Sequence, residues 1–228
     1  MSDDRIPLRI EATAYVRVHI PDDVAEGPAP ALMALHGYAQ DGEAMFAYAK
    51  SVAPAGTIVI APEGPQAFYA ERWRKDVGAR RIGYGWIADP DRAAAEARNR
   101  DFLGKALDHA AEAHAIDPAR TVVLGYSQGV GVAADFAVHA RERVGGLIGL
   151  AGGVPTANRP ALGALEGLPV LWLTGTRDRY YAADYNAKVV ERLAASGTDL
   201  EAEALDLEHA LLDDVAPRVT AWLSARLG

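Results

Sequence analysis

The chain is a series of short, mainly apolar runs separated by longer, Ala-rich stretches in which apolar residues recur with helical spacing. Buried parallel strands are short and apolar, and runs of this kind occupy 31–36, 57–61, 121–125, 145–151, 169–174 and 200–206. The helical stretches between them are 41–53, 90–115, 128–141, 181–196 and 211–227. An earlier run at 8–19 is half polar, which predicts an antiparallel edge hairpin before the parallel strands. This alternation predicts an α/β fold, with right-handed crossovers that place helices on both faces of a mostly parallel central sheet.

Length and composition favour a single globular domain over residues 1–228. Half of the 228 residues are hydrophobic and 24% are charged, and a chain of this length buries about 70% of the surface that it exposes when unfolded. No repeat or low-complexity linker divides the sequence. We therefore expect a single domain.

The net charge of −8 argues against nucleic acid or an anionic membrane surface as the main partner. It does not exclude a neutral ester or a small lipid as the ligand. One stretch is locally basic, and its charges are either solvated loop side chains or a recognition element for an anionic substrate group. Its members are Arg72, Arg74, Lys75, Arg80 and Arg81.

The absence of cysteine excludes disulfides, thiolate catalysis and Cys-based zinc sites. The first five residues are polar and lack an apolar signal core. No apolar run approaches the roughly 20 residues that a membrane-spanning helix needs. These features predict a soluble cytoplasmic protein without stable membrane insertion, and they leave the oligomeric state open.

Three residues that together could form a catalytic triad follow three different predicted strands. Ser127 lies in Gly-Tyr-Ser-Gln-Gly directly after the run 121–124, Asp178 follows 169–174, and His209 follows 200–206. Ligands of such sheets bind beyond the carboxyl ends of the strands. The pentapeptide is typical of a nucleophile elbow, and the order Ser, Asp, His is that of α/β-hydrolases.

The chemistry explains why these residue types belong together. A serine hydroxyl is a poor nucleophile until an imidazole removes its proton, and His209 would do so and then protonate the leaving group. Asp178 would hold the imidazole in the correct tautomer. Asp206 is the alternative acid and Asp184 a poorer one, because they fall within a predicted strand and a predicted helix. We expect His36 to brace its own loop by hydrogen bonding rather than to act as the base.

An ester hydrolase also needs donors for the oxyanion. The backbone N–H of Gln128, just after the nucleophile, and that of Tyr38, after His36-Gly37, are the natural candidates. Since main-chain groups would do this work, the side chains of Tyr38 and Gln128 are expected to be free to vary without loss of chemistry.

These motifs resemble those of the phospholipase/carboxylesterase family, which includes the acyl-protein thioesterases. Gly-Tyr-Ser-Gln-Gly resembles the family's Gly-Phe-Ser-Gln-Gly elbow, and similar features are the His36-Gly37 loop, Ala61-Pro62 and Asp117-Pro118-Ala119-Arg120. The resemblance covers about residues 28–227. It implies a compact α/β-hydrolase fold without a large lid domain, hydrolysis of carboxylic esters without a cofactor, and a place for Trp86 near the substrate.

The chain departs from the family's pattern at three places. Tyr38 stands where an aliphatic residue is usual, Val130 follows the elbow where a small residue is common, and Glu208 precedes His209 where the family has glycine. These differences concern substrate identity more than hydrolytic chemistry.

The stretch 66–87 is expected to overhang the site. Its aromatic residues either line an acyl or aryl pocket or anchor a long loop to the body of the protein; they are Phe68, Tyr69, Trp73, Tyr84 and Trp86. Tyr180 and Tyr181, just after Asp178, pose the same question. We take His36, Trp86 and Tyr180 as candidate substrate-pocket residues.

The sequence thus predicts a serine hydrolase that cleaves small to medium carboxylic esters through an acyl-enzyme. An acyl-thioesterase or lysophospholipase acting on lipidated substrates is the alternative within the same class. A perhydrolase or acyltransferase would use the same triad. A non-catalytic binding protein with this fold is the alternative from a different class.

Overall fold

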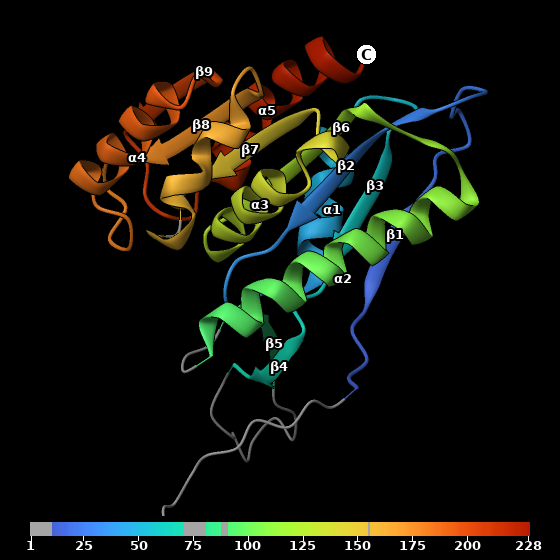
Figure 1. The fold of residues 1–228 in the computed structure, drawn as a ribbon, viewed down its shortest axis with the longest axis horizontal. Helices are drawn as coiled ribbons and strands as arrows, with labels where there is room; N and C mark the ends of the chain where they lie inside the picture. The colour runs from blue at the N-terminus through green and yellow to red at the C-terminus, as the bar shows by residue number, and fades with distance from the viewer. Residues whose placement is uncertain (1–10, 71–80, 88–90, 155) are drawn as a thin grey trace, which may run out of the picture.

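The computed structural model describes residues 11–70, 81–87, 91–154 and 156–228. A seven-stranded sheet runs through the middle in the order β1-β3-β2-β6-β7-β8-β9 (Figure 1). Its strands are β1 (Val16–His19), β2 (Ala29–Leu35), β3 (Ile58–Pro62), β6 (Ile116–Tyr126), β7 (Gly146–Leu150), β8 (Pro169–Gly175) and β9 (Asp199–Leu205). All neighbouring strands are parallel except β1 and β3. The predicted α/β architecture with a mostly parallel sheet is therefore confirmed.

The first strand is antiparallel and lies at the sheet edge, as expected, but its partner is β3 and not the next strand in sequence. The prediction of a hairpin was wrong for a physical reason. Every residue of β2 is buried, so β2 needs a neighbour on each side, and β3 and β6 take these places. The half-exposed β1 is left for the edge, where one side of a strand faces solvent.

In the part of the chain that the structure describes, five α-helices cover the two faces of the sheet (Figure 1): α1 (Gly42–Val52), α2 (Arg92–Ala113), α3 (Gln128–His139), α4 (Ala183–Ala195) and α5 (Leu212–Leu227). Alternate residues of β2 point to opposite faces. Met33 packs with the layer that contains α2, α3 and α4, whereas Leu32 packs with the layer that contains α1 and α5. Two short 3-10 helices, η1 (Arg141–Arg143) and η2 (Thr156–Leu165), complete the α3 side.

A separate antiparallel ribbon forms from β4 (Gln66–Tyr69) and β5 (Ile82–Gly85). It lies apart from the main sheet, at the lower end of Figure 1. The sequence predicted an overhang at 66–87 without strands, because strands of four residues are too short to stand out in the sequence pattern. An isolated bridge between Gln40 and Tyr84 ties the ribbon to the loop after β2. Trp73 and four of the five basic residues, Arg72, Arg74, Lys75 and Arg80, lie outside the described residues.

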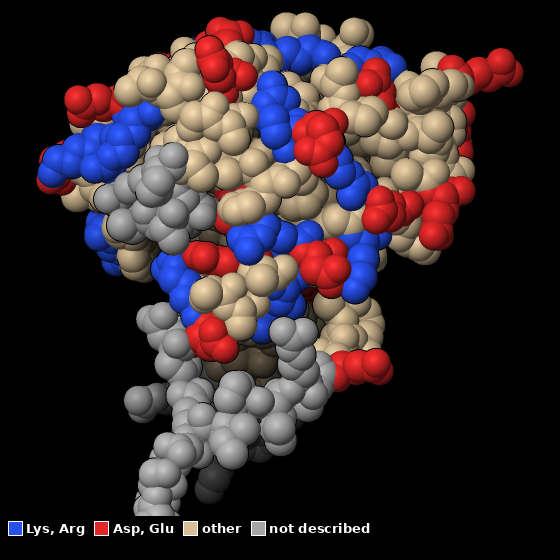
Figure 2. Space-filling model, in the orientation of Figure 1, with Lys and Arg blue, Asp and Glu red and all other residues tan. Residues whose placement is uncertain are grey.

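The visible face of the molecule carries interspersed charges of both signs (Figure 2). Several charged side chains of the protein form ion pairs, such as Arg143 with Asp108 and Lys105 with Asp101. Among the described residues, no helix is both long and apolar enough to cross a membrane.

Candidate active site

Ser127 sits at the sharp turn between β6 and α3. Its backbone has φ 53° and ψ −116°, a region that costs a non-glycine residue about 1–3 kcal/mol and persists only where the surroundings enforce it. The N–H of Ser127 donates to the carbonyl of Leu150 on β7 at 2.9 Å. The turn is thereby held against the sheet, and the hydroxyl projects beyond the strand ends.

The two glycines of the motif are required by close backbone contacts. A Cβ on Gly125 would lie 2.5 Å from the Gly129 carbonyl oxygen, and a Cβ on Gly129 would lie 2.4 Å from the carbonyl oxygen of Leu35. Neither contact can be relieved by rotating a side chain, because the obstructing atoms belong to the backbone. The spacing of glycines around Ser127 is thus a packing requirement between β6, α3 and the end of β2.

Gly129→Ala should lower the free energy of unfolding by about 1–3 kcal/mol, the usual cost of overpacking a filled site. Urea denaturation followed by circular dichroism measures this. Gly163→Ala is the matched control, since a Cβ there meets nothing within 4 Å, and it should change stability by less than about 0.5 kcal/mol. Equal stability of the two variants would contradict the packing argument.

Three side chains from three elements meet at the carboxyl edge of the sheet. The His209 Nε2 lies 2.9 Å from the Ser127 Oγ, and the His209 Nδ1 lies 2.7 Å from the Asp178 Oδ2. The Asp178 side chain is fully buried and His209 is 18% exposed. A carboxylate can only accept, so Nδ1–H donates to Asp178, and Nε2 is left to accept from the serine hydroxyl.

The second carboxylate oxygen of Asp178 accepts two backbone hydrogen bonds. The N–H groups of Tyr180 and Tyr181 donate to Oδ1 at 2.7 Å and 3.1 Å. With His209 on Oδ2, the buried carboxylate has donors on both oxygens. Its orientation, and through it that of His209, is fixed by the loop after β8.

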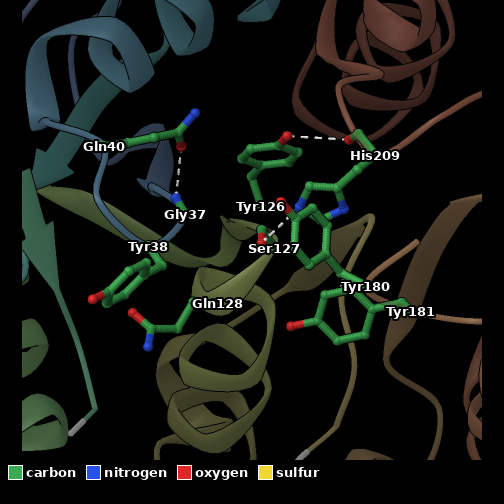
Figure 3. Close-up of a pocket in the computed structure, with 9 residues that line it drawn as sticks. All are labelled: Gly37, Tyr38, Gln40, Tyr126, Ser127, Gln128, Tyr180, Tyr181 and His209. Carbon is green, nitrogen blue, oxygen red and sulfur yellow. Dashed lines mark hydrogen bonds between the residues drawn. The ribbon is translucent and has the colours of Figure 1, made fainter. Parts of the chain in front are cut away.

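Three tyrosine rings surround the imidazole of His209. The ring centroids of Tyr180, Tyr126 and Tyr181 lie 4.8, 5.5 and 5.9 Å from that of His209. The Tyr126 hydroxyl also donates to the His209 carbonyl at 3.1 Å (Figure 3). Tyr126 is the variable residue of Gly-x-Ser-x-Gly, and the motif gave no sign of this second role.

Burial is the main cause that raises the pKa of the Tyr126 and Tyr181 phenols above the usual value. Negative charge on Asp178 adds to the effect at both. At Tyr181, hydrogen bonding with Ser127 acts in the opposite direction. Both phenols therefore stay neutral hydrogen-bonding groups through neutral and mildly alkaline pH.

The loop after β2 presents the second predicted oxyanion donor. Among the described residues, the backbone N–H groups of Tyr38 and Gln128 have no hydrogen-bond acceptor. The neighbouring Gly37 N–H is engaged, donating to the Gln40 Oε1 at 2.8 Å (Figure 3). Ala39 has φ 62° and its N–H donates to the Tyr84 carbonyl, so the turn is tied to β5. The arrangement leaves two N–H groups available beside Ser127.

The Gln128 side chain has a structural role that the sequence did not reveal. Its Oε1 accepts from the Trp86 N–H at 3.0 Å, and its Nε2 donates to the Ile87 carbonyl at 3.2 Å. The side chain thus links the elbow to the end of β5. The expectation that it is free to vary needs this correction.

His36 and Trp86 lie behind the site and do not line it. Both are fully buried. The His36 Nδ1 donates to the Gly37 carbonyl at 2.7 Å, its Nε2 accepts from the Gly64 N–H at 2.9 Å, and the Trp86 indole donates to the His36 carbonyl at 2.9 Å. Burial lowers the pKa of His36, which favours this neutral form. The bracing role expected for His36 is confirmed, and the placement of His36 and Trp86 in the substrate pocket is corrected.

The two alternative acids, Asp206 and Asp184, make their contacts with other residues and not with His209. Asp206 follows β9 rather than lying within it, its side chain is 86% exposed, and it pairs with Arg177 at 2.8 Å. Asp184 lies in the first turn of α4, 3.9 Å from Lys188. Asp178 is the carboxylate that contacts His209.

A cavity of about 590 Å³ opens in front of Ser127 (Figure 3). Its described lining residues are Gly37, Tyr38, Gln40, Tyr126, Ser127, Gln128, Tyr180, Tyr181 and His209. Tyr180 is the predicted pocket residue that lines it. Tyr38 stacks on Phe68 of β4 at a centroid distance of 4.9 Å, so the ribbon supports the rim. The volume is within the range of small-molecule sites.

Among the described residues, no group of three or more His, Asp or Glu side chains is arranged to hold a metal ion. The chemistry that the cavity offers is that of an imidazole-activated hydroxyl with two backbone donors beside it.

Solved structures of similar fold include a carboxylesterase of Bacillus cereus and the acyl-protein thioesterase 2 of Zea mays. The Bacillus cereus enzyme is 16% identical with a TM-score of 0.70, over 94% of this chain and 95% of that chain. The Zea mays enzyme is 18% identical with a TM-score of 0.66, over 95% of this chain and 100% of that chain. The esterase PE8 is 21% identical with a TM-score of 0.69, over 96% of this chain and 100% of that chain. At these identities the likeness establishes the fold, which is that of the α/β-hydrolases.

A comparison with curated protein sequences finds no relative. The sequence does match a family description over residues 22–225, nearly its whole length. The resemblance seen in the elbow and in the His36-Gly37 loop is thereby confirmed, and the chain belongs to the phospholipase/carboxylesterase family.

Proposed function

We propose that this protein is a serine esterase that hydrolyses small to medium carboxylic esters through an acyl-enzyme on Ser127. The observation that carries the proposal is the continuous hydrogen-bonded series Ser127–His209–Asp178, built on a strained elbow and open to a cavity. Family membership supports hydrolysis of the esterase or thioesterase type. The proposal adds to this a substrate class and a role for each residue of the site.

In the first half-reaction the Ser127 Oγ attacks the ester carbonyl carbon while His209 Nε2 takes the hydroxyl proton. The carbonyl oxygen becomes an oxyanion and accepts from the N–H groups of Tyr38 and Gln128. The C–O bond to the alcohol then breaks, and the imidazolium gives its proton to the departing oxygen. Asp178 stabilises the imidazolium without itself becoming protonated.

In the second half-reaction, water replaces the alcohol. His209 removes a proton from the water as it attacks the acyl carbon, a second oxyanion forms in the same place, and the bond to Ser127 breaks. Ser127 regains its proton from His209, and the carboxylic acid leaves. The two half-reactions use the same groups in reverse order.

The cavity favours short or medium acyl groups over long chains. None of its described lining residues is aliphatic, and four are tyrosines, whose rings are apolar but whose hydroxyls are polar. A long acyl chain would need a continuous aliphatic surface for stable burial, at about 0.8 kcal/mol for each CH₂. The fold shared with an acyl-protein thioesterase keeps acyl thioesters as the second candidate.

The test is the intact mass of the protein after incubation with a fluorophosphonate probe. Wild type should gain one adduct and Ser127→Ala none. Ser224→Ala is the matched control, because Ser224 is an exposed serine of α5 far along the chain from the elbow, and it should label like wild type. A folded wild-type protein without adduct would overturn the proposal and favour a binding protein with a hydrolase fold.

Wild-type protein that has not been exposed to the probe would then be assayed with p-nitrophenyl esters and matched acyl thioesters of 2 to 16 carbons. Highest kcat/KM at the short end of the ester series supports the proposal. Highest kcat/KM for the longest thioesters would replace it with the thioesterase alternative.

A further inference from the structure

A second cavity of about 500 Å³ adjoins the catalytic one. Its described lining residues are Gln40, Ala44, Ala47, Tyr48, Ser51, Tyr126, Ala210, Leu212 and Asp213. Gln40 and Tyr126 line both cavities. These two side chains therefore form the boundary across which a ligand of the first cavity reaches the second.

The second cavity lies on the side of the site from which an alcohol would leave. Ala210, Leu212 and Asp213 directly follow His209 in the chain, and Tyr126 holds the His209 carbonyl. In Figure 3, Tyr126 lies between Gln40 and His209, while Tyr38 and Gln128 lie on the opposite side of Ser127. The leaving oxygen must approach His209 Nε2 to be protonated, whereas the oxyanion must point to Tyr38 and Gln128. The alcohol portion of an ester is thus directed toward Gln40 and Tyr126.

The wall formed by α1 leaves room for such a group. Ala44, Ala47 and Ser51 are spaced three and four residues apart, so they share one helix face, and their side chains are small. Tyr48 packs beside them and is largely buried, and its hydroxyl has no hydrogen-bond partner among the described residues. Larger residues at these positions would fill the space.

The polar groups of this cavity select a kind of alcohol. The Gln40 Oε1 accepts from the Gly37 N–H, so its amide NH₂ is the group that can donate to a ligand. The Ser51 hydroxyl donates to the Tyr48 carbonyl, and its oxygen can still accept. Asp213 is the one charged residue among the described residues that line this cavity. Burial, followed by the charge of Asp213, raises the pKa of Tyr48. A hydroxyl-bearing alcohol can donate to Asp213 and exchange hydrogen bonds with the amide and hydroxyl groups. An alcohol with a carboxylate or phosphate would meet like charge.

We propose that this second cavity is the leaving-group subsite, and that it accepts alcohols that carry further hydroxyl groups and no negative charge. The inference rests on the proposed esterase function, and it assigns specificity to residues of α1 and of the start of α5 that take no part in the chemistry. Ala47 and Asp213 are its main determinants, one through size and the other through charge.

The size test uses three butyrates with one common acyl group: 2,3-dihydroxypropyl, 2-methylbutyl and methyl butyrate. The alcohols of the first two esters have similar shapes, but one carries hydroxyl groups where the other carries methyl groups. The alcohol of the methyl ester is too small to reach the second cavity. In wild type, kcat/KM for the dihydroxypropyl ester should exceed that of the 2-methylbutyl ester about tenfold, the discrimination expected from one net hydrogen bond.

Ala47→Phe should lower kcat/KM for the dihydroxypropyl ester at least about tenfold relative to methyl butyrate, since filling a pocket discriminates at that level. Dividing by the methyl ester value removes any change in the amount of active enzyme. Ala111→Phe is the matched control, because it makes the same change at an exposed alanine of α2, a helix in the layer on the other face of the sheet. It should leave the ratio as in wild type.

The charge test compares the butyrate esters of glycolate and of glycolamide. Wild type should hydrolyse the glycolate ester with a lower kcat/KM than the glycolamide ester. Asp213→Asn should reduce this difference in kcat/KM between the two esters about three- to tenfold, as expected for a like-charge contact near the surface. Asp214→Asn, the same change one residue further along α5, should have a smaller effect.

The outcomes distinguish a failure of the proposed esterase function from a failure of the leaving-group subsite. A protein that takes no fluorophosphonate adduct and hydrolyses no ester loses the proposed function itself. A protein that hydrolyses all five esters but shows unchanged ratios in both Ala47→Phe and Asp213→Asn keeps its esterase function and overturns the leaving-group subsite.

Discussion

Ser127→Ala is expected to lower kcat for short-chain esters by about 10⁴–10⁶-fold, because the proposed nucleophile is lost and only the oxyanion donors and binding contacts remain. Folding should be unaffected. The substitution removes one hydroxyl oxygen and keeps a Cβ at the same backbone position, so the strain at φ 53° is unchanged. Steady-state hydrolysis of p-nitrophenyl butyrate and a thermal melt together measure both quantities.

The preparation must be free of host esterases for an effect of this size to be seen. A sample of Ser127→Ala purified in parallel with wild type, with active sites counted by the fluorophosphonate adduct, sets the background. Retention of more than a few per cent of wild-type kcat in a sample that takes no adduct would overturn the role of Ser127.

Asp178→Asn is expected to lower kcat by about 10⁴-fold, because it reverses the tautomer of the base. The Asp178 Oδ1 accepts from the N–H groups of Tyr180 and Tyr181, so the oxygen of an asparagine would keep that place. The asparagine NH₂ would then face His209 Nδ1, which has to become the acceptor. The proton moves to Nε2, opposite the Ser127 hydroxyl, and the imidazole can no longer take the serine proton.

Asp206→Asn is the matched control. It makes the same chemical change at an exposed carboxylate whose partner is Arg177, and exposed ion pairs contribute only about 0–1 kcal/mol. Its kcat should stay within about twofold of wild type, while the kcat of Asp178→Asn falls. The opposite ranking would transfer the role of the acid to Asp206.

The elbow could be predicted from sequence because its determinants are local. A short apolar strand, two glycines two residues either side of Ser127 and a helix-compatible stretch are all within about twenty residues. The order of Ser127, Asp178 and His209 at the ends of successive strands also followed from the pattern, since parallel strands present their carboxyl ends at one edge. The structure brings these three side chains together.

The partner of β1 could not be predicted in the same way. Its sequence indicates an edge position, but the choice between β2 and β3 depends on which other strand is buried on both sides. That choice is made by the whole sheet. The burial of Trp86 could not be predicted either, because it depends on contacts with His36 and Asn99, which lie 50 and 13 residues away in the chain.

The fold class, the parallel sheet, the elbow and the type of chemistry could be predicted from the chain alone, because periodicity, glycine placement and residue order are properties of neighbouring positions. Which aromatic residues line the cavity in front of Ser127 depends on the tertiary structure. Packing places the rings of Tyr126 and Tyr180 against His209, and it buries His36 and Trp86 behind the residues that line the cavity. It also sets α1 beside the start of α5, and so creates the second cavity. Such choices depend on side-chain packing between segments far apart in the chain, which no local pattern encodes.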